Sequence, residues 1–293
     1  MQCPTHGVTQ VRLPWAEPRR RLTLLMERLI IDLIRQCRTV KGAGDIASVS
    51  WDEAWGVMRR AVARGRARTE ARPIAYIGVD EKAFRKGHRD HTIGCDLARA
   101  TVEFVAEDRK TASLAAYAQL TDAQQSALDA VAMNRWEPYI GATREGLPEG
   151  DTKIVFDRFH IMRDMTKAVD TVRKQEHRAL RRDGEDSPLT GTTSVWLFSD
   201  EGRPERHAAT FATLQALNLK VGRAWAIKEA LRTRWTYRQH EAAKRCFTRW
   251  YGWAVRSWLD PVKAVAATLK RHLDGVLRFV EHPITNGVAE GLK

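Results

Sequence analysis

Three acidic residues stand where carboxylates from distant points of the chain could meet. Asp80 ends an apolar run over residues 74–79, and Asp157 ends a second one over residues 153–156. Glu290 follows a long helical stretch. Two divalent metal ions about 4 Å apart catalyse phosphoryl transfer, and hard cations such as Mg²⁺ prefer carboxylate ligands. The three acids are therefore candidate metal ligands, although each one alone is equally compatible with a solvated surface position.

The elements that would position these acids follow an alternating order. Apolar runs of strand length occur five times, and two stretches of helical periodicity separate the later runs. This order predicts an α/β layout with a mixed sheet, and it is also the order of a ribonuclease-H-like fold. From His160 onward we expect an all-α region, with a polar break over residues 181–191. The predicted strands are 74–80, 91–96, 101–106, 130–133 and 153–156, and the predicted helices are 113–127, with a possible break at Thr121–Asp122, and 136–147.

The residues before the first strand have a different character. A helix is predicted over 20–37, a short helical segment over 40–47, and a basic helix from residue 51 that is capped by Ser50. A basic linker, 64–72, follows. This order is typical of a helix-turn-helix, and an ordinary three-helix unit with a basic outer face is an equal alternative. Residues 3–6 carry a Cys and a His with the spacing of half a zinc motif.

Composition favours a polyanionic partner. The chain has 293 residues and a formal net charge of +13, with 43% hydrophobic residues that are sufficient for a packed core. Nucleic acid is the expected partner, and a ribosomal, tRNA-binding or merely basic protein is the alternative. No apolar run is long enough to span a membrane, no secretory signal is present, and four scattered cysteines do not suggest disulfides, so we expect a cytoplasmic protein. Five tryptophans in the all-α region are expected in the core, with stacking on an unpaired base as the alternative for one of them.

Several long motifs, in a fixed order, closely resemble the ISL-three family of insertion-sequence transposases. The resemblance covers nearly the whole chain, and its first part looks like the end of a zinc motif followed by a helix-turn-helix. The motifs are CPTHGV at 3–8, WDE at 51–53, IGVDEKAFRKGH at 77–88, KIVFDRFHIM at 153–162, TVRKQEH at 171–177 and ITNGVAEGL at 284–292.

The resemblance implies a ribonuclease-H-like catalytic domain of the DDE type. It implies cleavage and strand transfer with Mg²⁺ or Mn²⁺ at terminal inverted repeats of double-stranded DNA, by a homodimer on DNA in the bacterial nucleoid. Carried over by position, Asp80 is the first acid and Glu290 the last. The second acid is either Asp157 or the position of Asn134, where the family shows an aspartate followed by methionine and this chain has Asn134-Arg135. Topology slightly favours position 134.

The two assignments predict opposite activities. If the second acid belongs at position 134, the chain lacks one of three carboxylates and is inactive or severely impaired, and a DNA-binding remnant that occupies the element ends and represses transposition becomes the alternative function. If Asp157 is the second acid, the metal-ligand set of Asp80, Asp157 and Glu290 is complete. Both ends of the chain also look cut relative to the family, which would leave Glu290 in a fraying segment.

These expectations give five regions and six candidate phosphate contacts. The regions are a zinc-motif remnant (1–18), the helix-turn-helix with its basic linker (19–72), the catalytic core (73–180), an all-α insertion (181–282) and the start of the last catalytic helix (283–293). The candidate DNA contacts are Arg59, Arg60, Arg64, Arg85, Lys86 and Arg158.

Overall fold

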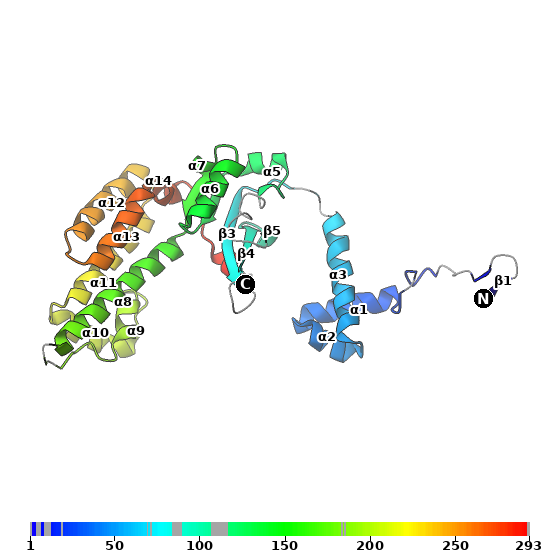
Figure 1. Cartoon of the computed structure of the whole chain (residues 1–293), viewed down its shortest axis with the longest axis horizontal. Coiled ribbons are helices and arrows are strands. Elements are labelled where there is room, and N and C mark those ends of the chain that lie inside the picture. Colours follow the sequence, from blue (N-terminus) through cyan, green and yellow to red (C-terminus); the bar gives the residue numbers. More distant parts are fainter. Residues whose placement is uncertain are drawn as a thin grey trace. The chain divides into compact units, whose positions relative to one another are not determined.

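The chain divides into two compact units, Met1–Ala71 and Arg72–Lys293 (Figure 1). The computed structural model describes all residues except 1, 4–6, 9–12, 19, 69, 71, 84–89, 107–116, 183, 185, 292 and 293. Side chains are also left undescribed at residues 2, 3, 7, 8, 82, 83, 90, 289 and 290.

Three helices form the body of the first unit. They enclose a small core around Ile30, Ala54 and Val57. Ser50 caps the third helix as predicted, because its Oγ accepts a hydrogen bond from Glu53 N at 3.2 Å while Glu53 Oε2 accepts one from Ser50 N. The helices are α1 (Leu24–Cys37), α2 (Val40–Ala47) and α3 (Trp51–Arg68), and a short hairpin of β1 (Gln2–Cys3) and β2 (Gly7–Val8) precedes them.

Two predicted boundaries in this unit were wrong. The first helix begins at Leu24, not at residue 20, because the side chain of Thr23 accepts a hydrogen bond from Met26 N and caps it there. Residues 64–68, predicted as linker, form the last turns of α3. Arginine has a high helix propensity, so this basic stretch continues the helix although it buries little.

A mixed sheet of five strands lies at the centre of the second unit, counted over the residues described. Its strand order is β5-β4-β3-β6-β7, with β3–β4 and β4–β5 antiparallel and β3–β6 and β6–β7 parallel. This is the mixed α/β sheet that the sequence predicted, and it is consistent with a ribonuclease-H-like fold. The strands are β3 (Tyr76–Ala83), β4 (Asp90–Asp96), β5 (Thr101–Ala106), β6 (Ala130–Met133) and β7 (Ile154–Phe156).

Helices connect the parallel strands. The predicted helix over 113–127 is described only in part, and its last segment starts at Asp122 because Thr121 and Gln124 form a capping box at the predicted break. Lys153, predicted in a strand, belongs to a short helix instead. That helix begins at Gly150, a position that requires glycine because any side chain there would collide with the Thr143 carbonyl. The helices are α5 (Asp122–Ala127), α6 (Glu137–Gly146), α7 (Gly150–Lys153) and α8 (Arg158–Arg182).

Of the remaining helices, α9, α11 and α13 pack on α8, α14 packs on β7 and α15 on β3 and β4, and most of the buried apolar residues form one core that the helices share with the sheet. Trp225 and Trp250 lie in that core as predicted, whereas Trp258 is 89% exposed at the turn between two helices. No helix in the described part of the chain has the length and hydropathy needed to cross a membrane. The helices are α9 (Thr193–Leu197), α10 (Ala208–Ala216), α11 (Lys220–Arg232), α12 (His240–Val255), α13 (Asp260–Arg271), α14 (Leu273–Leu277) and α15 (Gly287–Gly291), and three 3₁₀ turns lie at Glu205–His207, Thr233–Thr236 and Arg278–Val280.

Candidate functional site

Asp80 lies inside strand β3 and not at its end. The strand continues to Ala83, because residues 80–83 pair with β4. The prediction that Asp80 terminates the strand was therefore wrong, and the reason is that an antiparallel partner extends β3 beyond the point where its parallel partner β6 stops. Asp80 is 4% exposed, and its Oδ1 accepts a hydrogen bond from Glu81 N at 2.8 Å.

Strand register brings three of the predicted site residues into one row. Gly78 pairs with Ala132 on β6, and Ala132 pairs with Val155 on β7. Counted two residues onward from these partners, the register aligns Asp80 within β3 with Asn134 and Asp157, which directly follow the last residues of β6 and β7, and Asp157 N still donates to the Met133 carbonyl at 2.9 Å. Neighbouring strands lie about 4.8 Å apart, so Asn134 is one strand from Asp80 and Asp157 is two. We call these three residues the edge row.

Asn134 ends strand β6 with a local turn. Its Oδ1 accepts a hydrogen bond from Trp136 N at 3.0 Å, a geometry that asparagine shares with aspartate. The next residue, Arg135, is largely buried and forms an ion pair with Asp164. Burial lowers the pKa of Arg135, while the charges of Asp164 and Asp157 act in the opposite direction. The residue next in sequence to the middle position of the edge row is thus a cation paired with Asp164.

Both carboxylate oxygens of Asp157 accept hydrogen bonds. Oδ2 lies 2.9 Å from His160 Nδ1, and Oδ1 accepts from Thr285 Oγ1 at 2.9 Å and from Asn286 N at 3.4 Å. Since a carboxylate only accepts, His160 Nδ1 carries the proton. Asp157 is 1% exposed. Burial alone would raise its pKa, but the hydrogen bonds from His160 and Thr285 outweigh burial and hold the pKa of Asp157 below its ordinary value of 3.8.

Asn286 fastens the last segment of the chain to the sheet beside Asp80. It is fully buried, and its Nδ2 donates to the Val79 carbonyl at 2.7 Å. Gly78 makes room for it, because a Cβ at that position would collide with Asn286 Oδ1. The sequence analysis missed Thr285 and Asn286 as individual residues. The motif over 284–292 was the one signal that could have pointed to them.

Helix α15 follows directly and packs against β3 and β4. Glu290 belongs to this helix, but its side chain lies outside the described residues, as do Arg85 and Lys86. Among the side chains that are described, no group of three or more His, Cys, Asp or Glu residues is arranged to hold a metal ion. The described part of the edge row offers two carboxylates with one neutral amide oxygen between them, and three hydrogen bonds already engage Asp157, so these three residues fit a divalent cation less well than three carboxylates would.

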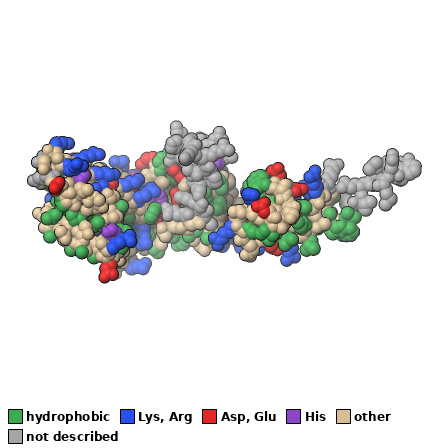
Figure 2. All heavy atoms as spheres, turned by 90° about the horizontal axis from the view of Figure 1, so that it is seen from below, with side chains coloured by type: hydrophobic (Ala, Val, Ile, Leu, Met, Phe, Trp, Pro, Cys, Tyr) green, Lys and Arg blue, Asp and Glu red, His purple; other side chains and the backbone are tan. Residues whose placement is uncertain are grey.

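The predicted DNA-binding arginines of α3 fall into two groups. Arg60 forms an ion pair with Glu27, a residue of α1 that is 3% exposed, and Arg64 lies 3.7 Å from the same carboxylate. Arg59, in contrast, is exposed. Arg158 of the second unit is also exposed, one residue after Asp157. Lys and Arg side chains are spread across the helical region of that unit in Figure 2.

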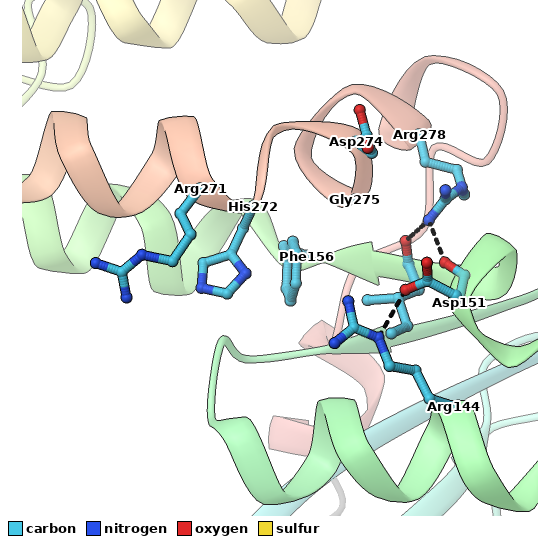
Figure 3. Close-up of a pocket in the computed structure, with 9 residues that line it drawn as sticks. Arg144, Asp151, Phe156, Arg271, His272, Asp274, Gly275 and Arg278 are labelled. Carbon is cyan, nitrogen blue, oxygen red and sulfur yellow. Dashed lines mark hydrogen bonds and ion pairs between the residues drawn. The ribbon is translucent and has the colours of Figure 1, made fainter.

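A small polar cavity of about 90 Å³ lies at the β7 edge of the sheet (Figure 3) and contains none of the predicted site residues. Arg278 donates to the carbonyls of Asp151 and Ile154 at 3.1 and 2.6 Å, and Arg144 pairs with Asp151 at 2.7 Å. Gly275 packs directly on Phe156, since a Cβ there would come within 2.5 Å of the ring. The contacts of Arg278 and Gly275 hold the segment around α14 against the edge strand, so the cavity has a structural explanation.

Comparisons with known proteins identify the family. A model described as a transposase matches residues 77–293, well over half of the chain, and the helix-turn-helix domain of transposase family ISL3 matches residues 11–62. The second match confirms the helix-turn-helix. Transposases for insertion sequence element IS1557 from two Mycobacterium tuberculosis strains are 24% identical over 318 residues, which cover 99% of this chain and 70% of theirs. The transposase for insertion sequence element IS1001 of Bordetella parapertussis is 26% identical, over 75% of this chain and 54% of its own. The chain is thus a member of transposase family ISL3.

Proposed function

We propose that the chain binds the terminal inverted repeats of an insertion sequence through its helix-turn-helix unit. The exposed Arg59 on α3 and the net charge of +13 support a double-stranded DNA partner, because neutralised phosphates release counterions. The structural ion pairs of Arg60 and Arg64 with Glu27 make these two weaker candidates for phosphate contacts. In this proposal the protein works as a homodimer on DNA and is associated with the bacterial nucleoid.

The edge row carries the second part of the proposal, which concerns catalysis. The position adjacent to Asp80 is occupied by Asn134, and we infer that this is the place of the second catalytic acid. A divalent cation, Mg²⁺ or Mn²⁺, would be held by Asp80, Glu290 and an acid at position 134. An asparagine contributes no negative charge there, and the next residue, Arg135, is a cation paired with Asp164. The chain as it stands is therefore a transposase with severely impaired DNA cleavage and strand transfer.

Asp157 is the less favourable assignment for that acid. It lies two strands from Asp80, and its oxygens are engaged by His160, Thr285 and Asn286. A metal at Asp157 would compete with these hydrogen bonds for the carboxylate oxygens. In our proposal Asp157 instead holds the segment before α15, and through it the helix that carries Glu290.

The test compares strand cleavage and metal binding in matched variants. A labelled inverted-repeat duplex is incubated with Mg²⁺ or Mn²⁺ and with the unmodified chain, Asn134→Asp, or Asn134→Asp combined with Arg135→Met. We expect no cleavage by the unmodified chain and cleavage by one or both variants, lost again when Asp80→Asn is added. The affinity for Mn²⁺ should rise from the unmodified chain to Asn134→Asp and to the double variant. Electron paramagnetic resonance measures this affinity even when no DNA is cleaved. Cleavage by the unmodified chain that depends on Asp80 would contradict the proposal and return the role to Asp157.

A second function, repression by occupancy, is favoured by the independence of the first unit. Its core around Ile30 and Val57 and its Glu27–Arg60 pair involve no residue of the edge row. A chain of this kind can occupy the element ends and exclude an active transposase while cutting nothing. A mobility shift of inverted-repeat duplex that resists competition by tRNA, with no nick in the recovered DNA, is the expected result.

A further inference from the structure

A cavity of about 560 Å³ lies directly beside the edge row. Its walls come from the first turns of α8, from the 3₁₀ turn Thr233–Thr236 and from the segment that leads into α15. Thr285, which donates a hydrogen bond to Asp157, forms part of the wall. The cavity thus adjoins the place where the proposed function puts the reacting strand of DNA.

The wall combines aromatic rings with cations. Phe159 is 48% exposed, and Trp235, from the opposite wall, is partly buried over the guanidinium of Arg234. Arg158 also lines the cavity and forms no ion pair with any residue that the structure describes. Arg232 lines it as well, held by Glu229 at 3.2 Å. Aromatic faces bind nucleobases by stacking, and guanidinium groups bind phosphate oxygens.

Size and composition together select the ligand. Pockets of 300–1,000 Å³ typically enclose one small organic molecule, so a single nucleotide suits this volume and a paired duplex does not. Glu201, an acid among the described lining residues, accepts a hydrogen bond from the exocyclic amine of a base in this arrangement. A purely phosphate-binding site would need no exposed phenylalanine.

We propose that this cavity binds one unpaired DNA nucleotide next to the scissile position, with its base against Phe159 and Trp235 and its phosphate at Arg158. The inference rests on the proposed binding of the chain to DNA ends, and it adds that one nucleotide leaves the base stack there. Unstacking a base costs free energy, which the aromatic and cationic contacts in the cavity offset.

The test compares two DNA probes that differ by one nucleotide. One is a short duplex with a single bulged 2-aminopurine nucleotide, and the other is the same duplex without the bulge. We expect the unmodified chain to bind the bulged probe roughly 5-fold to 100-fold more tightly, because stacking on an aromatic side chain is worth about that factor for one base. The 2-aminopurine fluorescence should also change when the base moves from its duplex neighbours to Phe159.

Matched variants separate the cavity from general charge. Phe159→Ala and Arg158→Ala should each at least halve the logarithm of the affinity ratio between the bulged and the unbulged probe. Phe159→Tyr should leave this ratio unchanged. Arg178→Ala is the control, because it removes the same charge from an exposed position on the same helix, 20 residues farther along and so about 30 Å away. Circular dichroism verifies that each variant is folded.

The outcomes are distinct from those of the cleavage test. A bulge preference that disappears in the cavity variants but not in Arg178→Ala supports the inference even if no variant cleaves DNA. Equal affinity for the two probes, or a preference that Phe159→Ala and Arg158→Ala leave unchanged, overturns it while end binding by the first unit still stands. Failure to bind either duplex would refute the proposed function and the inference built on it together.

Discussion

At the scale of single residues, the contrast between Asp80 and Asp157 shows that two buried aspartates in the edge row need not share a role. A buried carboxylate is costly unless hydrogen bonds compensate for the lost water. Asp157 receives such bonds from three groups, two of them in a segment 128 and 129 residues later in the chain. The charge of Asp157 therefore holds the segment around residues 285–286 next to strand β7.

The substitution Asp157→Asn should destabilise the second unit by about 1–3 kcal/mol at pH 7, because it removes a charged acceptor from buried hydrogen bonds. The effect should depend on pH with a definite sign. The pKa of Asp157 in the fold is below 3.8, and in the unfolded chain it is about 3.9. Its contribution is therefore fully present above pH 5 and is lost as the pH falls through the folded pKa, so acid should weaken the unmodified chain more than the variant.

Hydrogen exchange of peptides from β6 and β7, followed at increasing urea concentration, measures the stability of the second unit alone. Asp151→Asn is the matched control, since the Asp151 side chain is 71% exposed and its loss should change stability little. Equal stability of Asp157→Asn and the unmodified chain at pH 7 would show that the buried carboxylate is not an anchor, and it would make Asp157 available again as a metal ligand.

At the scale of elements, the close approach of Asn286 to β3 determines where α15 lies. Gly78 permits this approach, because a Cβ there would collide with Asn286 Oδ1 and lie 2.6 Å from Leu97 Cδ2. Gly78→Ala should therefore destabilise the second unit by about 1–3 kcal/mol through overpacking. Amide exchange in residues 284–288 should accelerate more than exchange in β6, since the displaced side chain belongs to that segment.

Gly141→Ala provides the comparison in the same unit. A Cβ at Gly141 meets nothing within 4 Å, and alanine is favoured over glycine inside a helix such as α6. This variant should keep or slightly increase stability. If Gly78→Ala were equally harmless, the contact between Asn286 and β3 would not be the one that positions α15.

Local signals predicted much of the fold at this scale. The approximate positions of the five strands along the chain, the Ser50 cap and the break at Thr121 depend on residues only a few positions apart, and the sequence predicted all three. Strand ends were less predictable. Whether β3 stops at Asp80 or continues to Ala83 depends on its partner β4, and the sequence of β3 alone does not contain that information.

The candidate site was predictable in composition and not in arrangement. The acids Asp80, Asp157 and Glu290 indicated a metal-dependent chemistry, but the alignment of Asp80 and Asp157 with position 134 in the edge row depends on the register of three strands. The hydrogen bonds that occupy Asp157 come from residues more than 100 positions away. Likewise, the sequence predicted Arg60 as a phosphate contact. Its ion pair with Glu27 could not be predicted, because Glu27 lies on another helix.

At the scale of the whole molecule, the charge of +13 is divided between side chains that meet internal partners and side chains exposed to solvent. Arg60, Arg135 and Arg278 belong to the first kind, because each contacts an acid or a carbonyl of its own unit. Arg59 and Arg158 belong to the second. Net charge alone therefore does not tell which of the cations are available to DNA.

This division predicts how DNA binding should respond to salt. The logarithm of the association constant falls with the logarithm of salt concentration by about 0.9 for each phosphate contact. Arg59→Ala should lower the magnitude of that slope by about 0.9, measured by fluorescence anisotropy with a labelled duplex, and should leave the first unit stable.

Arg60→Ala should leave the slope unchanged, yet it should speed hydrogen exchange in α1, because Glu27 loses its closest partner in a buried position. If Arg60→Ala reduced the slope as much as Arg59→Ala while α1 stayed protected, Arg60 would be a phosphate contact after all. The ion pair seen with Glu27 would then have to exchange for a DNA phosphate on binding.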